Sequence, residues 1–573
     1  MRDKVVLAAV VALALGPALY VLFLSAGMPH LGRLQDDGLY WLSAKSLAEG
    51  NGYRIPSLPD EPFQTKYPPL FPLMLSVVWR VFPAPPGNQA LASALTWLLL
   101  PLMLLTSWHL FRQHGLGRLR SSILLLLIGW SPAVAYLSTT LMAEMMFACL
   151  LLLSLHLAER AGDPRTGERT AFLAGLVGGV AYLAKTAAIP IFLTAPLCLL
   201  VLRQRRRAGL FLGGALLLAL PWVIWVQAHH QSASDVVSLY YTDYLGYQLS
   251  NFSFGRLPSM LWKNLEGLLA GIGGLVFSNP NEDRWLRIVG RVLAVLAAIG
   301  LFRIARRTGR LQSAAFTAGY ALTLLLWHFP PNERFLLPVM PILLMGLSEE
   351  AVHLGSLAWG AFRSPAVPQR SVAVLLMALF LGLCLAAVYS AGVAYFRYFP
   401  RFFKSEGKQL AEDRGLYRWI DQNIPPDALL LAYRDTRLAL WTGRKAIRLI
   451  VPPRLYYDGD EAKTDLYFHS LPEFVQQQGV THIVVSATDR YSLDTPDRGL
   501  PIVERITATD RRFRLLYQGE GVALFAIDNT EAELADRLFP KDVTGFRTRE
   551  SQCERPLPTS GGREEAMPRR SPS

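Results

Sequence analysis

Two adjacent carboxylates, Asp36 and Asp37, lie shortly after the first long apolar run, in the segment QDDGLYWLSAKSLAEGNGY. A carboxylate held close to a hydroxyl or an amine can remove its proton and so act as a general base. Asp is also favoured at a helix N-terminus, and the residues that follow have the pattern of a short amphipathic helix. One acid is enough to cap that helix. We therefore predict that Asp36 and Asp37 are catalytic.

Two cations and a further acid-base pair stand near the ends of other apolar runs. Lys66 precedes the proline-led stretch YPPLFPLM, and Arg334 lies between two apolar runs in NERFLLP. Each is suited to bind a phosphate and stabilise a leaving group, or else to contact lipid headgroups. Glu144 and Lys185 are costly at the end of a membrane span unless they have a partner or a function. We predict that Lys66 and Arg334 bind phosphate, and that Glu144 and Lys185 bind substrate.

Aromatic side chains are concentrated in residues 240–254, YYTDYLGYQLSNFSF. Tyr244 is a candidate for stacking on a sugar, although aromatic belts at membrane interfaces have the same composition. Tyr40, on the short helix after the acidic pair, is a second candidate for substrate binding.

The sequence contains no pattern typical of a metal or cofactor site. HExxH, G-x-S-x-G and the glycine-rich phosphate-binding patterns are absent, and the four cysteines lack metal-ligand or disulfide spacing. We predict neither a metal nor a cofactor, so the chemistry rests on carboxylates and cations.

The composition is that of a membrane protein. Of the 573 residues, 52% are hydrophobic and only 18% are charged, whereas a soluble protein has about 25% charged residues. Apolar runs of ~20 residues, the length that crosses a bilayer, recur along the chain. We predict a polytopic α-helical fold with about eleven transmembrane helices. The predicted spans are 5–25, 89–111, 120–138, 143–159, 170–186, 188–202, 208–227, 285–302, 312–329, 335–353 and 371–393.

Arginine-rich loops fix the predicted orientation. With the N-terminus in the cytoplasm, this set of spans puts every arginine-rich loop on the cytoplasmic side, as the positive-inside rule requires. The net charge of +13 therefore needs no nucleic-acid partner. The first run is long for a signal peptide and lacks a clear cleavage site, so we predict a retained first helix. The protein is expected in a bacterial inner membrane or a plasma membrane.

Three regions follow from this topology. Residues 1–393 form the predicted transmembrane domain, with a catalytic first outer loop at 26–88, in which the apolar stretch 67–82 is too short to span. Residues 394–544 are predicted to form a small extracytoplasmic α/β domain, because strand-like and helical patterns alternate. Residues 545–573 are rich in Pro, Ser, Gly and charged residues and are predicted to be disordered.

The first outer loop resembles that of the GT-C membrane glycosyltransferases. The similar residues are Asp36, Asp37, Tyr40, Ala44, Leu47, Gly50, Gly52, Tyr53, and Lys66 before Pro68-Pro69-Leu70. The likeness is to the branch with protein O-mannosyltransferases and the aminoarabinose transferases of lipid A. It implies a polyprenyl-phosphate sugar donor, an extracytoplasmic protein, lipid or glycan acceptor, Asp36 as the base and Lys66 on the donor phosphate. Leu39 replaces an Arg of the aminoarabinose transferases, and Tyr67 separates Lys66 from the prolines.

The function predicted from the sequence is therefore that of an inverting glycosyltransferase, transferring a hexose or a pentose. A multi-pass transporter or flippase of a lipid-linked or anionic solute is an alternative, as is a non-catalytic membrane subunit. Transporters often have repeated halves and interrupted helices at the bilayer midplane. Here no repeat is evident and the ionisable residues gather at outer helix ends, which favours chemistry at the membrane surface.

Overall fold

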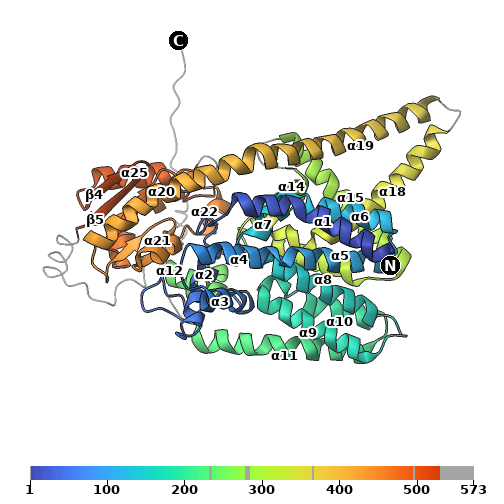
Figure 1. The fold of residues 1–573 in the computed structure, drawn as a ribbon, viewed down its shortest axis with the longest axis horizontal. Helices are drawn as coiled ribbons and strands as arrows, with labels where there is room; N and C mark the ends of the chain where they lie inside the picture. Colours follow the sequence, from blue (N-terminus) through green and yellow to red (C-terminus); the bar gives the residue numbers. More distant parts are fainter. Residues whose placement is uncertain (1, 231–234, 278–283, 364–366, 494–496, 529–573) are drawn as a thin grey trace, which may run out of the picture. The chain divides into compact units, whose positions relative to one another are not determined.

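The computed structural model describes residues 2–230, 235–277, 284–363, 367–493 and 497–528 (Figure 1). Helices make up most of the first part of the chain. They are α1 (Arg2–Leu24), α2 (Asp36–Ala48), α3 (Leu70–Val81), α4 (Gly87–Trp97), α5 (Leu99–Gln113), α6 (Arg118–Gly129), α7 (Pro132–Thr139), α8 (Glu144–Ala161), α9 (Glu168–Ala184), α10 (Ile191–Val201), α11 (Arg205–His229), α12 (Val236–Thr242), α13 (Tyr244–Ser250), α14 (Leu257–Val276), α15 (Arg284–Thr308), α16 (Gln312–Leu325), α17 (Glu333–Leu336), α18 (Met340–Phe362) and α19 (Val367–Val393).

Several of these helices are long and apolar enough to cross a membrane, and the chain is an integral membrane protein. By length and composition the described residues contain six such helices, or seven if the bent pair α6 and α7 is one span. The prediction of about eleven spans is not confirmed. Other predicted spans form helices that are short for a membrane span: α9 has 17 residues, α16 has 14 and α10 has 11. Helix α8 has 18 residues but carries charged residues at both ends.

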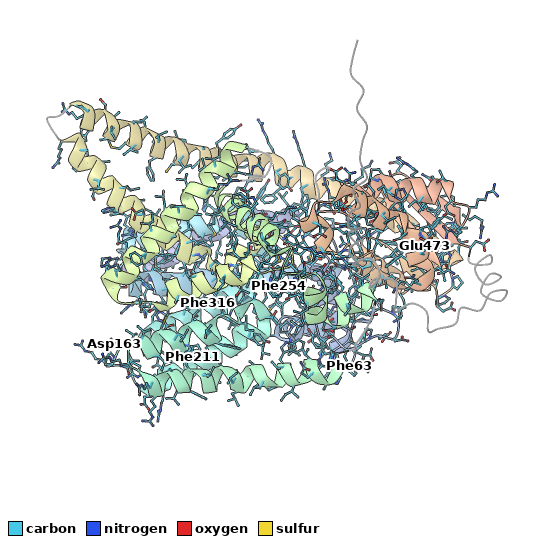
Figure 2. All side chains as sticks on the ribbon, turned by 180° about the vertical axis from the view of Figure 1, so that it is seen from behind. Phe63, Asp163, Phe211, Phe254, Phe316 and Glu473 are labelled. Carbon is cyan, nitrogen blue, oxygen red and sulfur yellow. The ribbon has the colours of Figure 1, made fainter. Side chains whose placement is uncertain are left out.

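The helices of the bundle pack through small residues and large buried rings. Gly175 on α9 lies against the backbone of α11, where a Cβ atom would overlap the carbonyl oxygen of Phe211. Phe211 on α11 and Phe316 on α16 are fully buried (Figure 2). By contrast α19 exposes most of its apolar side chains, including Leu379 and Leu385, as expected of a helix surrounded by lipid.

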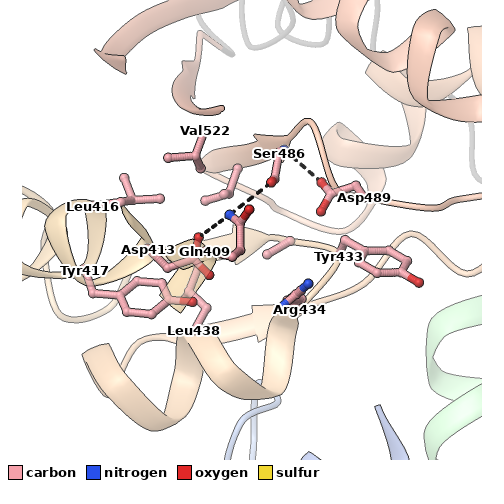
Figure 3. Close-up of a pocket in the computed structure, with 12 residues that line it drawn as sticks. Gln409, Asp413, Leu416, Tyr417, Tyr433, Arg434, Leu438, Ser486, Asp489 and Val522 are labelled. Carbon is pink, nitrogen blue, oxygen red and sulfur yellow. Dashed lines mark hydrogen bonds between the residues drawn. The ribbon is translucent and has the colours of Figure 1, made fainter. Parts of the chain in front are cut away.

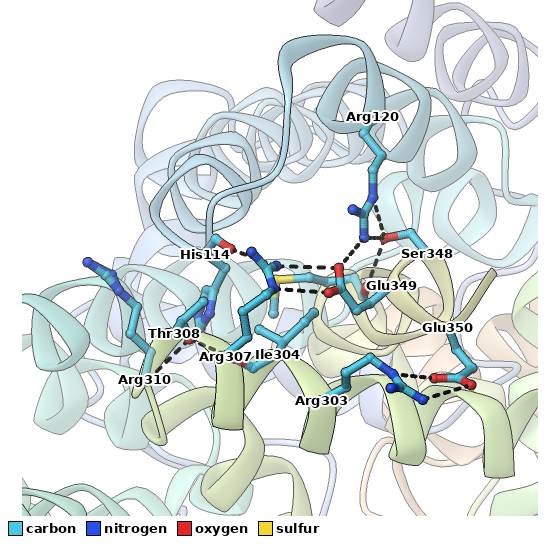
Figure 4. A network of polar contacts seen from close by, with 11 residues as sticks. His114, Arg120, Arg303, Ile304, Arg307, Thr308, Arg310, Ser348, Glu349 and Glu350 are labelled. Atoms are coloured by element: carbon cyan, nitrogen blue, oxygen red, sulfur yellow. Dashed lines mark hydrogen bonds and ion pairs between the residues drawn. The ribbon is translucent and has the colours of Figure 1, made fainter. Parts of the chain in front are cut away.

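Ion pairs join three helices at the end predicted to face the cytoplasm (Figure 4). Glu349 of α18 accepts hydrogen bonds from Arg307 of α15 and Arg120 of α6, and Glu350 accepts from Arg303. The arginines that the sequence assigns to cytoplasmic loops are thus partly paired with acids of α18, and these contacts fasten α6 and α15 to it.

Helix α20 continues from α19 through a short π-helical turn, η3 (Ala394–Tyr398), into a region of mixed helices and strands. The elements are α20 (Phe399–Asn423), β1 (Leu429–Leu431), α21 (Asp435–Thr442), β2 (Lys445–Ile447), α22 (Pro453–Asp458), α23 (Glu461–His469), α24 (Leu471–Gln477), β3 (His482–Ser486), α25 (Gly499–Thr509), β4 (Phe513–Gly519) and β5 (Val522–Ile527). We call residues 399–527 the α/β segment.

The strands of the α/β segment form one five-stranded sheet in the order β2-β1-β3-β5-β4. Strand β1 runs parallel to β2 and β3, whereas β5 is antiparallel to β3 and β4. Strands β1 and β2 have only three residues each, whereas β3, β4 and β5 have five to seven. The predicted disordered tail, 545–573, lies outside the described residues.

An ion pair and a hydrogen bond join the α/β segment to the first outer loop. Glu406 of α20 pairs with Arg33 of the loop and with Arg434, which follows β1. Arg437 on α21 donates to the carbonyl oxygen of Pro29 at 3.0 Å. The crevice beside Arg434, at the carboxyl ends of β1 and β3, has space of only about 20 Å³, enough for one water (Figure 3). It is therefore part of this junction and too small for a sugar.

Candidate active site

The acidic pair lies at the start of α2, where the backbone makes a sharp entry into the helix. Gln35, the residue before the helix, is buried and has φ +63°, a left-handed conformation that is costly for a residue other than glycine. Its side-chain amide is fixed at both ends: Nε2 donates to the hydroxyl of Tyr241 and Oε1 accepts from the hydroxyl of Tyr240, each at 2.8 Å. These bonds hold the turn. From this turn the side chains of Asp36 and Asp37 enter two different environments.

The carboxylate of Asp36 belongs to a network of four charged side chains. Arg334, which follows α16 in the chain, donates from Nη2 to Asp36 and from Nε to Glu144 at the start of α8. Lys185, at the end of α9, donates to the same Glu144 oxygen at 2.6 Å. All four residues are predicted candidates, and the structure brings them together from four separate segments. Their two negative and two positive charges balance.

Asp36 is held in its ionised form. Burial alone raises its pKa, but the positive charges of Arg334 and Lys66 and a hydrogen bond from the hydroxyl of Tyr67 outweigh it and lower the pKa to about 2. The carboxylate is 19% exposed, so it can still be reached from the site. An ionised carboxylate with an open side is able to accept a hydrogen bond from an incoming hydroxyl or amine.

Asp37 has different partners. Its carboxylate is completely buried and accepts hydrogen bonds from the backbone N–H groups of Gly32 and Gly38, both at 3.0 Å. Burial raises its pKa to about 7, against the effect of these two bonds. Asp37 therefore holds the loop between α1 and α2 and forms no hydrogen bond or ion pair with Arg334, Glu144 or Lys185. Its predicted catalytic role stays a prediction.

Lys66 points into a ring of tyrosines. Its Nζ lies 3.2 Å from the ring centre of Tyr240 and 4.8 Å from that of Tyr244. The side chain is 6% exposed, and no described residue forms an ion pair or a side-chain hydrogen bond with its ammonium. Burial lowers the pKa of Lys66 to about 7, although Asp36 and Asp435 attract its positive charge. An unpaired cation next to a base is suited to bind an anion.

The two predicted aromatic contacts are placed differently. Tyr244 lines the tyrosine ring around Lys66, whereas Tyr40 is 2% exposed and packs against the rings of Tyr67 and Phe71. Their predicted substrate contacts stay predictions. In the part of the chain that the structure describes, no group of three His, Cys, Asp or Glu side chains could hold a metal ion.

Three residues in this region were not predicted as candidates: Gln35, Tyr67 and Arg448. Gln35 and Tyr67 are direct sequence neighbours of predicted residues, so a wider window around Asp36 and Lys66 would have included them. Arg448, just after β2, reaches Gln35 from 413 positions away, and no local pattern marks it.

The arrangement of helices has a counterpart among solved structures. ArnT from Cupriavidus metallidurans, solved bound to undecaprenyl phosphate, matches 90% of this chain and 97% of its own chain with a TM-score of 0.50 and 16% identity. The chain has the GT-C fold. The predicted resemblance is thus confirmed at the level of the fold. Lower similarity is found to the oligosaccharyltransferase of Archaeoglobus fulgidus (TM-score 0.48, 13% identity, 87% of this chain and 69% of that chain).

A third structure with the GT-C fold, the mycobacterial arabinofuranosyltransferase AftD, matches 91% of this chain and 41% of its own with a TM-score of 0.44 and 15% identity. No protein-family model and no curated protein matches the sequence. The GT-C fold is therefore supported by the arrangement of elements, while the chemistry has to be argued from the site.

Proposed function

We propose that the protein is an inverting glycosyltransferase that uses a polyprenyl-phosphate-linked sugar. The donor enters from the bilayer, and a hexose or pentose is transferred to an acceptor on the extracytoplasmic side. The observation that carries the proposal is the pairing of an ionised, accessible carboxylate, Asp36, with a buried cation that lacks a counterion, Lys66. The undecaprenyl phosphate bound by the solved ArnT structure, which has the same fold, supports this choice of donor.

The reaction needs a base on one side of the anomeric carbon and a cation on the other. The acceptor oxygen or nitrogen forms a bond to the anomeric carbon, while the bond from that carbon to the phosphate oxygen breaks. The electron pair of the broken bond leaves with the phosphate, whose growing charge Lys66 stabilises. The acceptor proton goes to Asp36. Because attack and departure are on opposite sides, the configuration at the anomeric carbon inverts.

The charge network sets the strength of the base. A carboxylate with a pKa of about 2 is a weak base, so proton transfer accompanies bond formation and does not precede it. The hydrogen bonds from Arg334 and Tyr67 fix the orientation of Asp36 and leave its remaining lone pairs for the acceptor. Glu144 in turn holds Arg334 and is itself held by Lys185. Its second oxygen, Oε2, is buried and has no hydrogen-bond partner among the described residues.

The orientation in the membrane is part of the proposal. The N-terminus lies in the cytoplasm, and the loop that carries Asp36 and Lys66 lies outside together with the α/β segment. Labelling of a cysteine placed at exposed Asp60, which is on the same loop, tests this directly. Reaction with a membrane-impermeant reagent in intact cells is expected. Labelling only after the membrane is opened would contradict the proposal.

Sugar transfer is tested with radiolabelled polyprenyl-phosphate sugars and membranes as the source of acceptor. Wild-type protein is expected to transfer label, Asp36→Asn to lose at least about a hundredfold in rate, and Lys66→Met to lose a similar factor. Two matched controls are expected to keep wild-type rates. Asp60→Asn changes an exposed acid of the same loop, and Lys45→Met changes a partly exposed lysine of α2. Full turnover by a correctly folded Asp36→Asn protein would sink the assignment of the base.

A further inference from the structure

Arg448 is a second cation without an ion pair in the same region as Lys66. It follows β2 in the α/β segment, far from the first outer loop in sequence. Its guanidinium carbon lies 3.9 Å from the ring centre of Tyr433, and Nη1 is 3.4 Å from Oε1 of Gln35. Among the described residues no carboxylate forms an ion pair with it.

These contacts leave most of the hydrogen-bonding capacity of Arg448 unused. Gln35 Oε1 already accepts a shorter bond, 2.8 Å, from Tyr240, so Arg448 is not needed to satisfy it. A guanidinium has five N–H donors, and only one of those on Arg448 has a partner in the described residues. The unpartnered nitrogens of Arg448 are not sealed in the interior, unlike Nε of Arg434 and Arg437. The unused N–H groups of Arg448 therefore face space that a ligand can reach.

Arg448 and Lys66 contact two residues, Gln35 and Tyr240, that are hydrogen-bonded to each other. Lys66 lies over the ring of Tyr240, whose hydroxyl donates to Gln35, and Arg448 approaches the same Gln35 oxygen. Two cations that share neighbours repel each other, and the charge of Arg448 contributes to the low pKa of Lys66. Such an arrangement is unfavourable unless an anion completes it.

The charges around the two cations do not cancel. The one acid that acts on both is Asp435, which is completely buried, accepts a hydrogen bond from Tyr241 at 2.6 Å and forms no ion pair. Even when Asp435 is ionised, the two cations and this acid keep a net positive charge. Asp489 also acts on Arg448, but it accepts hydrogen bonds from Ser486 and Tyr491, and burial raises its pKa to about 7, so it is not a full counterion. The neighbouring network of Asp36, Glu144, Arg334 and Lys185 is neutral and offers no counterion. The missing charge is therefore that of a ligand.

We propose that Arg448, supplied by the α/β segment, and Lys66, supplied by the first outer loop, together bind the phosphate of a lipid phosphate. The identification of the ligand rests on the proposed function, whereas the anion site rests on the contacts given above. A guanidinium can bind the two free oxygens of a phosphate diester in parallel, and an ammonium can bind the oxygen that links the phosphate to the sugar and becomes free when that bond breaks. The α/β segment is then part of the site.

Binding of undecaprenyl phosphate to the full-length protein in detergent tests this proposal. Arg448→Gln is expected to weaken binding at least about tenfold, and Arg448→Lys to retain most of it, because one charged hydrogen bond is worth about that factor. Arg454→Gln, at an exposed arginine of the same segment, is the matched control and binds as the wild type does. Uncharged undecaprenol is expected to bind equally to all four proteins. Unchanged affinity of a folded Arg448→Gln protein overturns the proposal.

A second measurement uses the wild-type protein and needs no variant to fold. Phenylglyoxal modifies accessible arginines, and mass spectrometry locates the modified residues. Undecaprenyl phosphate is expected to protect Arg448 and leave Arg454 reactive, while undecaprenol, inorganic phosphate and phosphatidylglycerol at the same concentration protect poorly. Protection by inorganic phosphate or by phosphatidylglycerol to the same degree contradicts a site for a polyprenyl phosphate, and lack of any protection contradicts an anion site.

The results of these experiments distinguish a failure of the anion site from a failure of the proposed glycosyltransferase function. If undecaprenyl phosphate binds through Arg448 but no sugar is transferred, the anion site stands and the transferase does not. If transfer depends on Asp36 while Arg448→Gln leaves donor affinity and turnover unchanged, the transferase stands and Arg448 has no part in it.

Discussion

Arg334 donates a hydrogen bond to the carboxylate of Asp36, a residue 298 positions away in the sequence. The same guanidinium donates to Glu144, so one side chain fixes two acids relative to each other. A planar guanidinium can bridge two carboxylates with a defined geometry, whereas an ammonium acts as a point charge. The position of the proposed base is therefore set by Arg334.

Replacement of Arg334 is expected to change both the rate and its pH dependence. In Arg334→Gln the pKa of Asp36 rises, because a positive charge and a hydrogen bond that favour the ionised form are lost. Transfer falls by about a hundredfold, and the remaining activity is lost at a higher pH on acidification than in the wild type. Rates measured between pH 4 and 8 check this. Arg256→Gln, which removes an arginine from its ion pair with Asp458, serves as the control.

Replacement of Asp37 is expected to affect stability, whereas replacement of Asp36 is expected to affect catalysis. Its folded-state pKa of about 7 lies above the ordinary value of about 3.9, so the folded state binds the proton more tightly than the unfolded state. Stability from this group is fully present below about pH 4 and is lost as the pH rises through 7. In Asp37→Asn, thermal unfolding should depend less on pH over this range, and transfer should persist within about tenfold.

The same variant decides the role of Asp37. If Asp37→Asn unfolds like the wild type but no longer transfers sugar, then the second acid is catalytic, as the sequence alone predicts. If transfer persists and only the pH dependence of unfolding changes, Asp37 holds the loop through the amides of Gly32 and Gly38.

Gly38 is expected to tolerate no side chain. A Cβ atom at this position would lie 2.5 Å from Cβ of Thr436 on α21, which is far inside contact distance. Gly38→Ala should therefore push α2 and α21 apart, destabilise the protein by about 1–3 kcal/mol and reduce transfer, because Asp36 begins the same helix. Thermal unfolding in detergent measures the first effect. Gly38→Ala combined with Thr436→Gly restores space and should recover part of the loss; no recovery argues against the contact.

Sequence patterns located the charged residues but not their partners. Asp36, Glu144, Lys185 and Arg334 all stand out as ionisable groups at the ends of apolar runs, and a common membrane face brings such ends together. The contact of Arg448 with Gln35 spans 413 positions and joins a loop to a strand end, so no local periodicity encodes it. The number of spans is not settled by apolar runs for a related reason: a run such as that of α10 forms a helix of only 11 residues.

Binding of the donor is expected to weaken as the pH rises, because Lys66 must be protonated to attract a phosphate. Burial lowers its pKa to about 7, with Asp36 and Asp435 opposing the shift and Arg448 and Arg334 adding to it. Above that value the free protein loses the proton, and each further pH unit should raise the KM for the donor about tenfold. Binding between pH 7 and 8 should be accompanied by proton uptake. KM and kcat measured from pH 6 to 9 test this.

Lys66→Arg gives a variant whose charge does not titrate in this range. Its KM for the donor should change little between pH 6 and 9, while Lys45→Arg, on α2, should follow the wild-type profile. If the KM for the donor rises equally with pH in wild type and in Lys66→Arg, another group controls the affinity for the donor. A flat wild-type profile means that the buried ammonium does not bind the donor phosphate, and the site would then have to bind its anion through Arg448 alone.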